Sequence, residues 1–159
     1  MREAKAVLPG ASDVPRGWKK SGSHSYGRLP DNPQLASTSQ GFRASDLEGY
    51  VGFGVHTYKD RKDATSELAD FRKKSKPSQR VPVRIASSDE AYAVLSCFQQ
   101  PPSCGTMVLI RVGSVWGYVN LNVDTDRPTD PKVLNSAARG LVERIRQAQR
   151  GERPTAKIS

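Results

Sequence analysis

Long hydrophobic runs are missing from this 159-residue sequence, which also contains only two cysteines and two histidines. The longest apolar run, Met107–Ile110, has the length of a buried strand, whereas a membrane-spanning helix needs ~20 apolar residues. A secretory leader would also need a longer apolar segment near the amino terminus. We therefore expect no transmembrane segment, and we expect any signal sequence to be absent from this chain.

Motifs of known catalytic and cofactor sites are missing as well. The sequence has no phosphate-binding or dinucleotide-binding glycine pattern, no nucleophile elbow and no paired-carboxylate pattern. Asp124 and Asp126 lie in a stretch rich in Asp, Thr and Pro, which is more typical of a turn than of a cation site. We therefore predict a protein that is not an enzyme and has no cofactor. In the enzymatic alternative, His56 would act as a general base beside Tyr58 and near Asp60.

Cys97 and Cys104 bracket a six-residue segment that contains Pro101 and Pro102. So short a loop can bring the sulfurs within bonding distance, and the resulting disulfide would staple a hairpin rather than constrain the whole fold. Such a bond predicts a location outside the cytoplasm. Two reduced thiols buried in the core are the alternative. We predict no metal site, because the cysteines are seven residues apart and the histidines, His24 and His56, are thirty-two apart, unlike zinc ligand pairs.

The net charge of +9 is unevenly distributed along the chain. Residues 59–84 carry nine basic and four acidic side chains, and residues 127–157 carry eight and three, whereas residues 85–126 are mildly acidic. Basic segments are attracted to anionic surfaces or polymers, although they more often form a solvated outer face. An intracellular nucleic-acid binder is the alternative, disfavoured because no recognised RNA- or DNA-binding motif is present.

Apolar alternation predicts a strand over 48–58, with Val51, Phe53 and Val55 on one face. Gly52 and Gly54 lie at the centre of the opposite face, where another backbone, a helix or a ligand can approach closely. The other expected elements are one helical turn over 12–17, a helix from 60 or 63 to about 74, strands over 81–85 and 91–98, a hairpin over 106–123 and a final helix over 130–151. Residues 19–45, rich in Ser, Gly, Asn, Pro and Gln, are expected to form a long, loose connection with room for one short edge strand.

Gly113-Ser114 is the strongest hairpin signal, because a two-residue loop that begins with glycine favours a type II′ turn. The register that follows pairs Val112 with Val115, Ile110 with Gly117 and Val108 with Val119. One face of the hairpin is then apolar and must meet the helices. The other face places Arg111 opposite Trp116, within reach of a stacked cation–π contact.

Aromatic and polar side chains share this second face of the predicted sheet, and they are the candidate ligand-binding residues: Tyr50, His56, Arg111, Trp116 and Tyr118. Aromatic rings beside a cation and amides can stack on a ligand, a sugar or a base. The alternative is that Trp18 and residues 19–45 simply cover the face.

Consecutive strands joined by short turns predict an α+β fold, in which helices pack mainly on one face of an antiparallel sheet. We expect a flexible amino terminus over 1–5, a single domain over 6–150 and a disordered tail over 151–159.

Three short motifs resemble a known family: Leu8-Pro9-x3-Asp13-Val14-Pro15-x-Gly17-Trp18 at the start, the Asp60–Phe71 helix after an aromatic strand, and Arg111-Val112-Gly113-Ser114-Val115 before a long strand. They are similar to the extracellular sensor domain of a mycobacterial receptor serine/threonine kinase and to its actinobacterial secreted and lipoprotein relatives. The likeness covers about residues 6–148. It implies a strongly twisted antiparallel sheet packed by helices, with a cleft for an unidentified ligand. Members usually carry two disulfides, whereas this chain can form only one.

Together these observations predict an exported, non-enzymatic, sensor-like binding domain. We expect it either free outside the cell or on the cell surface, held there by a lipid anchor. Its partner would be a small molecule, a cell-wall component or a protein, bound by the sheet face or an adjacent cleft.

Overall fold

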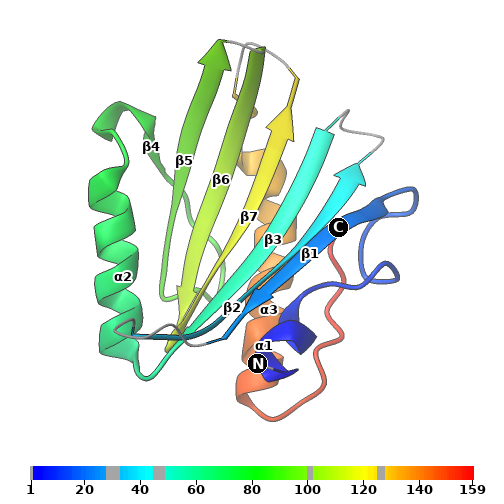
Figure 1. Ribbon diagram of the computed structural model, residues 1–159, viewed down its shortest axis with the longest axis vertical. Coiled ribbons are helices and arrows are strands. Elements are labelled where there is room, and N and C mark those ends of the chain that lie inside the picture. Colours follow the sequence, from blue (N-terminus) through cyan, green and yellow to red (C-terminus); the bar gives the residue numbers. More distant parts are fainter. Residues whose placement is uncertain (1, 28–32, 45–48, 100–101, 125–127) are drawn as a thin grey trace.

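The computed structural model describes residues 2–27, 33–44, 49–99, 102–124 and 128–159. These residues form a seven-stranded sheet in the order β1-β2-β3-β7-β6-β5-β4, strongly twisted in Figure 1. The elements in chain order are α1 Arg2–Val7, β1 Lys19–Tyr26, β2 Gln34–Ala44, β3 Gly49–Tyr58, α2 Arg61–Lys74, η1 Pro77–Gln79, β4 Arg80–Pro82, β5 Glu90–Gln99, β6 Pro102–Val112, β7 Val115–Val123, η2 Pro131–Leu134 and α3 Asn135–Gln149.

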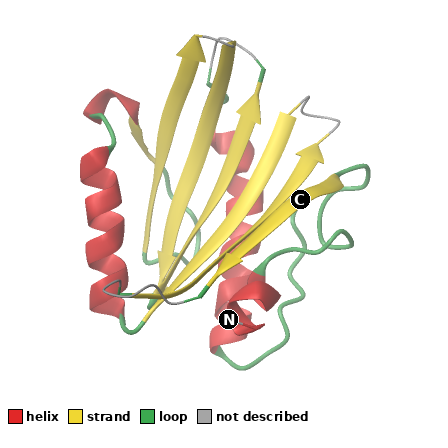
Figure 2. Cartoon of the chain, in the orientation of Figure 1, coloured by secondary structure: helices red, strands yellow, loops and turns green. Residues whose placement is uncertain are grey.

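The α+β class predicted from the sequence is confirmed. Every recorded strand pairing is antiparallel. In Figures 1 and 2, α3 runs behind the sheet and α2 stands beside its β5 side. Helices therefore contact both faces of the sheet, although α2 covers only part of the second face.

The predicted hairpin register is confirmed residue by residue. Val112 lies opposite Val115, and Gly113 has a φ of 59°, which the glycine-first turn requires. Cys97 and Cys104 are cross-strand partners of β5 and β6, and they form a disulfide. The bond therefore staples one hairpin, as its short spacing implied.

The main core lies between the sheet and α3. The amphipathic spacing of α3 directs Leu141 and Ile145 onto the sheet, where they join Phe53 and Val108, all at most 1% exposed. Burial of each such side chain contributes about 1.5–3 kcal/mol to the free energy of unfolding. The centre of this face is consequently occupied by α3.

The expected loose connection over 19–45 is wrong, because the chain there forms β1 and the eleven-residue β2. The apolar signal of β2 is interrupted by two inward-facing polar side chains, Thr38 and Gln40, which are 2% and 6% exposed. The Gln40 amide donates to the carbonyl oxygens of Gly22 and Gly41, at 2.6 and 3.0 Å. Hydrogen bonds thus allow the polar side chains of this strand to be buried.

Both ends of the chain also differ from expectation. The first helix spans Arg2–Val7 rather than 12–17, and Ala4 within it is buried. Residues 152–159, expected to be disordered, turn back after Gly151 along α3, as Figure 1 shows. Ile158 is 3% exposed, and its backbone N–H donates to the carbonyl oxygen of Asp13 at 2.6 Å. Burial of Ile158 and its backbone hydrogen bond to Asp13 hold the carboxy-terminal segment in place.

Arg144 of α3 joins the two terminal segments. Its buried guanidinium donates to the carbonyl oxygens of Val7 at 2.6 Å, Leu8 at 3.0 Å and Ala156 at 2.9 Å. It also pairs with the Asp13 carboxylate at 3.2 Å. These carbonyls and this carboxylate are consequently satisfied by a single side chain.

We predict that Arg144→Met lowers the free energy of unfolding by about 3–5 kcal/mol, because it removes the donor to the carbonyl oxygens of Val7, Leu8 and Ala156 and one of the cations paired with Asp13. Urea denaturation followed by circular dichroism measures this loss. Arg139→Met, an exposed change on the same helix, is the matched control and should cost less than about 0.5 kcal/mol. Equal losses in the two variants would contradict the role assigned to Arg144.

Candidate functional site

The second face of the sheet divides into a covered part and an open part. α2 covers one part by packing Ala64 and Leu68 against Tyr92, Leu109 and Trp116. The part that α2 leaves uncovered, called the open face below, carries these side chains and glycines: Ser37, Ser39, Gly41, Arg43, Tyr50, Gly52, Gly54, Tyr118, Asn120 and Asn122.

Within the described residues, the amino-terminal half of the chain does not close the open face. β1 and β2 pair edge to edge with the sheet and so widen the face instead of covering it. Trp18 packs against Phe42, whose side chain belongs to the α3-side core, with ring centroids 6.4 Å apart. Tyr50 is accordingly 40% exposed, and Arg43 and Asn122 are also exposed.

Glycines form the floor of the open face. A Cβ atom added at Gly54 would overlap the Tyr118 ring, one added at Gly41 would overlap the Tyr50 ring, and one added at Gly52 would overlap the Asn120 amide. The side chains therefore lie flat against the backbone of neighbouring strands. This is the cross-strand pairing in which an aromatic ring covers a glycine. The sequence predicted that another backbone, a helix or a ligand would approach the glycines of this strand closely. The groups that approach them are instead side chains of the same sheet.

A row of aromatic rings leads from the covered part onto the open face. His56 stacks on Trp116, with centroids 4.1 Å apart and planes inclined by 13°. Tyr118 lies next, 6.0 Å from His56, and its hydroxyl is hydrogen-bonded to Ser39. Tyr50 extends the aromatic surface toward the far end of β3.

His56 is held as a neutral ring. Burial lowers the pKa of its imidazole to about 4. Its Nδ1 lies 2.8 Å from the Gln34 side-chain oxygen, an acceptor, so Nδ1 carries the proton. Stacking on Trp116 and this hydrogen bond fix the orientation of the ring.

The structure brings only some of the predicted site residues together. Tyr50 and Tyr118 lie on the open face, and His56 lies at its margin. Trp116 is 7% exposed beneath α2, where its indole N–H donates to the Tyr58 hydroxyl at 2.5 Å. Trp116 is thus a buried ring on which His56 stacks.

Arg111 is buried, with 4% of its surface exposed, and its positive charge is paired with carboxylates of the same chain. Its guanidinium contacts the carboxylates of Asp89 at 2.9 Å and Glu90 at 3.7 Å. Arg111 is opposite Trp116 in register, as predicted, but His56 is the group that stacks on that indole. The cation–π contact that the structure records is instead Arg72 over Tyr92, at 5.5 Å.

Two polar side chains of the open face, Ser39 and Arg43, were missed because the sequence did not predict β2. A usable signal was present: Phe42 and Ala44 alternate with Gly41 and Arg43, and residues 37–39 are β-compatible Ser and Thr.

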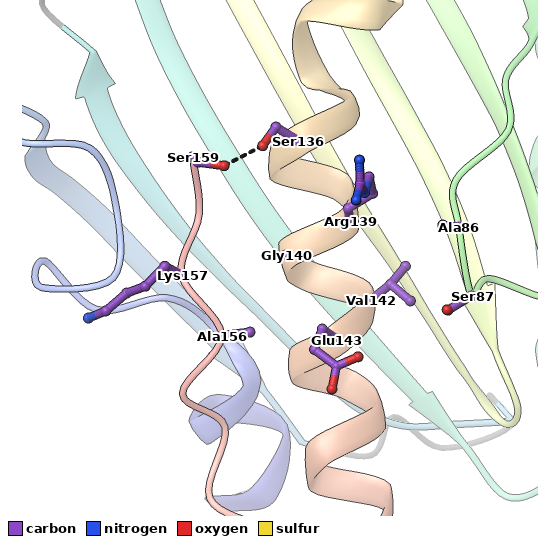
Figure 3. Close-up of a pocket in the computed structure, with 10 residues that line it drawn as sticks. All are labelled: Ala86, Ser87, Ser136, Arg139, Gly140, Val142, Glu143, Ala156, Lys157 and Ser159. Carbon is purple, nitrogen blue, oxygen red and sulfur yellow. Dashed lines mark hydrogen bonds between the residues drawn. The ribbon is translucent and has the colours of Figure 1, made fainter.

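A separate hollow of about 440 Å³ lies beside α3, between that helix, residues 86–87 and the carboxy-terminal segment. Figure 3 shows Arg139, Glu143 and Lys157 around it, with Ser136 hydrogen-bonded to Ser159 at 2.5 Å. Lys157 is already paired with Asp13 at 3.1 Å. Side chains of both charges line this hollow, so its electrostatics select no class of ligand.

Among the residues that the structure describes, no three His, Cys, Asp or Glu side chains are grouped as a metal site would require. In the same residues, no helix is both long enough and apolar enough to span a membrane.

Comparisons with known proteins identify the fold. No family model matches the sequence, and no curated protein matches it. Among solved structures, the fold is similar to that of the extracellular domain of PknH from Mycobacterium tuberculosis, with a TM-score of 0.58. The alignment covers 94% of this chain and 96% of that one at 8% sequence identity. The resemblance that the short motifs suggested is therefore confirmed at the level of the fold.

We predict that Gly54→Ala destabilises the protein by about 1–3 kcal/mol, because the added methyl group forces the Tyr118 ring off the sheet. Urea denaturation gives the size of the effect. Gly22→Ala is the matched control, since an added Cβ there meets no atom within 4 Å. A Gly54→Ala protein as stable as the Gly22→Ala protein would show that Tyr118 is not packed on the strand.

The lowered pKa of His56 predicts a pH-dependent stability. Between pH 6.5 and about 4 the unfolded chain binds a proton at this residue that the folded chain does not, so the free energy of unfolding falls as the pH is lowered through this window. His56→Phe keeps a stacking ring and should flatten that part of the curve. His24→Phe, at an exposed position, should leave the curve unchanged. Identical slopes in wild type and His56→Phe would contradict the prediction.

Proposed function

We propose that this chain is an exported, non-catalytic binding domain of the sensor type, and that the open face is its ligand-binding surface. The observation that carries the proposal is the open face itself. It is a polar and aromatic surface at the middle of the sheet, where no helix or terminal segment among the described residues packs.

The side chains of the open face suit recognition rather than catalysis. Tyr50 and Tyr118 offer aromatic rings, Asn120 and Asn122 offer amide donors and acceptors, and Arg43 offers a cation. The histidine nearest to them, His56, is fixed by stacking and by Gln34. Its low pKa makes it a weak proton acceptor near neutral pH.

The extracytoplasmic location rests on two independent supports. The Cys97–Cys104 disulfide is of a kind that persists in oxidising compartments. The fold is similar to that of an extracellular domain over nearly the full length of both chains. Attachment to the cell surface by a lipid is proposed together with this location.

Amide chemical-shift mapping tests the proposed surface. The ¹⁵N-labelled protein is titrated with pooled amino acids, nucleotides, neutral oligosaccharides, acidic oligosaccharides and short peptides. We expect at least one class to shift the amides of Ser39, Gly52, Gly54 and Asn120, and we expect Tyr50→Ala to weaken that response. Val133→Ala, a change at an exposed apolar residue of η2, is the control and should respond as wild type does.

Shifts confined to the hollow around Arg139 and Glu143, or no shifts with any class, would contradict the assignment of the open face.

A further inference from the structure

We propose that the ligand of the open face is an acidic oligosaccharide, whose sugar rings stack on Tyr50 and whose acidic groups bind Arg43 and Lys19. This inference rests on the proposed function and adds the chemical class of the ligand. Three features of the described residues carry it: the orientation of the tyrosine, the amides beside it and the distribution of charge.

Tyr50 presents an aromatic surface to solvent. Its ring lies over Gly41 and contacts the position of Gly52, so no side chain lifts it from the backbone. One face of the ring is therefore turned to the sheet, while the side chain stays 40% exposed. A ring fixed in this way offers a flat apolar surface at little entropic cost, and the C–H-rich face of a pyranose ring is complementary to it.

Two asparagine side chains lie beside the tyrosines on the same face of the sheet. The Asn120 side chain lies over Gly52, and the Asn122 side chain lies over Gly105 with its Oδ1 2.6 Å from where a Cβ would be. Each amide can donate and accept hydrogen bonds, as sugar hydroxyls do. Gly54, the cross-strand partner of Tyr118, is four residues along β3 from Tyr50, about 13 Å. This span fits an oligosaccharide better than a single sugar.

The charge carried by the strands themselves favours acidic ligands. The strands β1, β2, β3, β6 and β7 contain no Asp or Glu. Arg43 lies directly opposite Tyr50 on one side and opposite Lys19 on the other, and both cations are exposed. Within the described part of the chain neither side chain has an ion-pair partner.

Two like charges on opposing residues of paired strands repel each other. A bound carboxylate or phosphate group between Lys19 and Arg43 would remove that repulsion and accept charge-assisted hydrogen bonds from both. Acidic sugars supply such groups beside a ring that fits Tyr50. A single-stranded nucleic acid also combines rings with phosphates, but the Cys97–Cys104 disulfide favours a ligand outside the cytoplasm.

Isothermal titration calorimetry tests the inference with four probes: an α-1,4-linked tetragalacturonate, a 6-phosphorylated mannopentaose, the neutral galactose tetramer and an octathymidylate. We expect the acidic sugars to bind at least tenfold more tightly than the neutral tetramer, with affinity that falls as salt is raised. The preferred acidic sugar of the two shows whether the group recognised is a carboxylate or a phosphate. Melting temperatures establish that each variant is folded.

Variants locate the binding. Tyr50→Ala should weaken binding of every sugar at least tenfold. The double variant Lys19→Gln, Arg43→Gln should remove the difference between acidic and neutral sugars, whereas Arg139→Gln, which removes a cation beside α3, should change nothing. Acidic binding that survives Tyr50→Ala would be non-specific charge attraction and would overturn the inference, as would equal affinity for the neutral tetramer or tighter binding of the octathymidylate.

If no sugar binds while another compound class shifts the amides of the open face, the acidic-sugar inference fails and the proposed binding function stands. If no class shifts those amides, both fail.

Discussion

The register of β3 against β7 is the constraint on which both faces of the sheet depend. These strands lie side by side near the middle of the sheet, with Phe53 opposite Val119 and Gly54 opposite Tyr118. Because side chains alternate between faces, a slip of one residue would move the apolar side chains to the solvent and the tyrosine into the core. The core and the open face are thus specified by a single pairing.

The two faces are covered unequally, and composition explains why the protein tolerates this. Against α3 the sheet presents Val, Ile, Leu and Phe, whose burial requires a helix and both terminal segments, held together by Arg144. Beyond α2 the opposite face presents glycine, serine, asparagine and tyrosine, which water solvates without a large apolar patch. The glycines allow Tyr50 and Tyr118 to lie flat, so the uncovered surface is shallow and preformed.

Features that depend on local sequence patterns could be predicted from the sequence, whereas features that depend on tertiary contacts could not. Gly113 and the flanking valines set the hairpin register, and the short cysteine spacing implied the disulfide. β2 was missed because Thr38 and Gln40 face the core, where both form hydrogen bonds to β1 that the local sequence does not reveal. Two residues of the candidate site, Tyr50 and Tyr118, are on the open face. The burial of Trp116 by α2 and the ion pair of Arg111 with Asp89 are tertiary contacts that sequence periodicity does not reveal.

Tyrosine-selective nitration followed by peptide mass mapping tests the central claim most directly, because the claim requires Tyr50 to be open to solvent while the buried Tyr58 and Tyr92 are not. The account predicts that tetranitromethane modifies Tyr50 rapidly and leaves Tyr58 and Tyr92, which are 4% and 2% exposed, unmodified in the folded protein. Protection of Tyr50 as complete as that of Tyr92 would show that the sheet face is covered and would contradict the account.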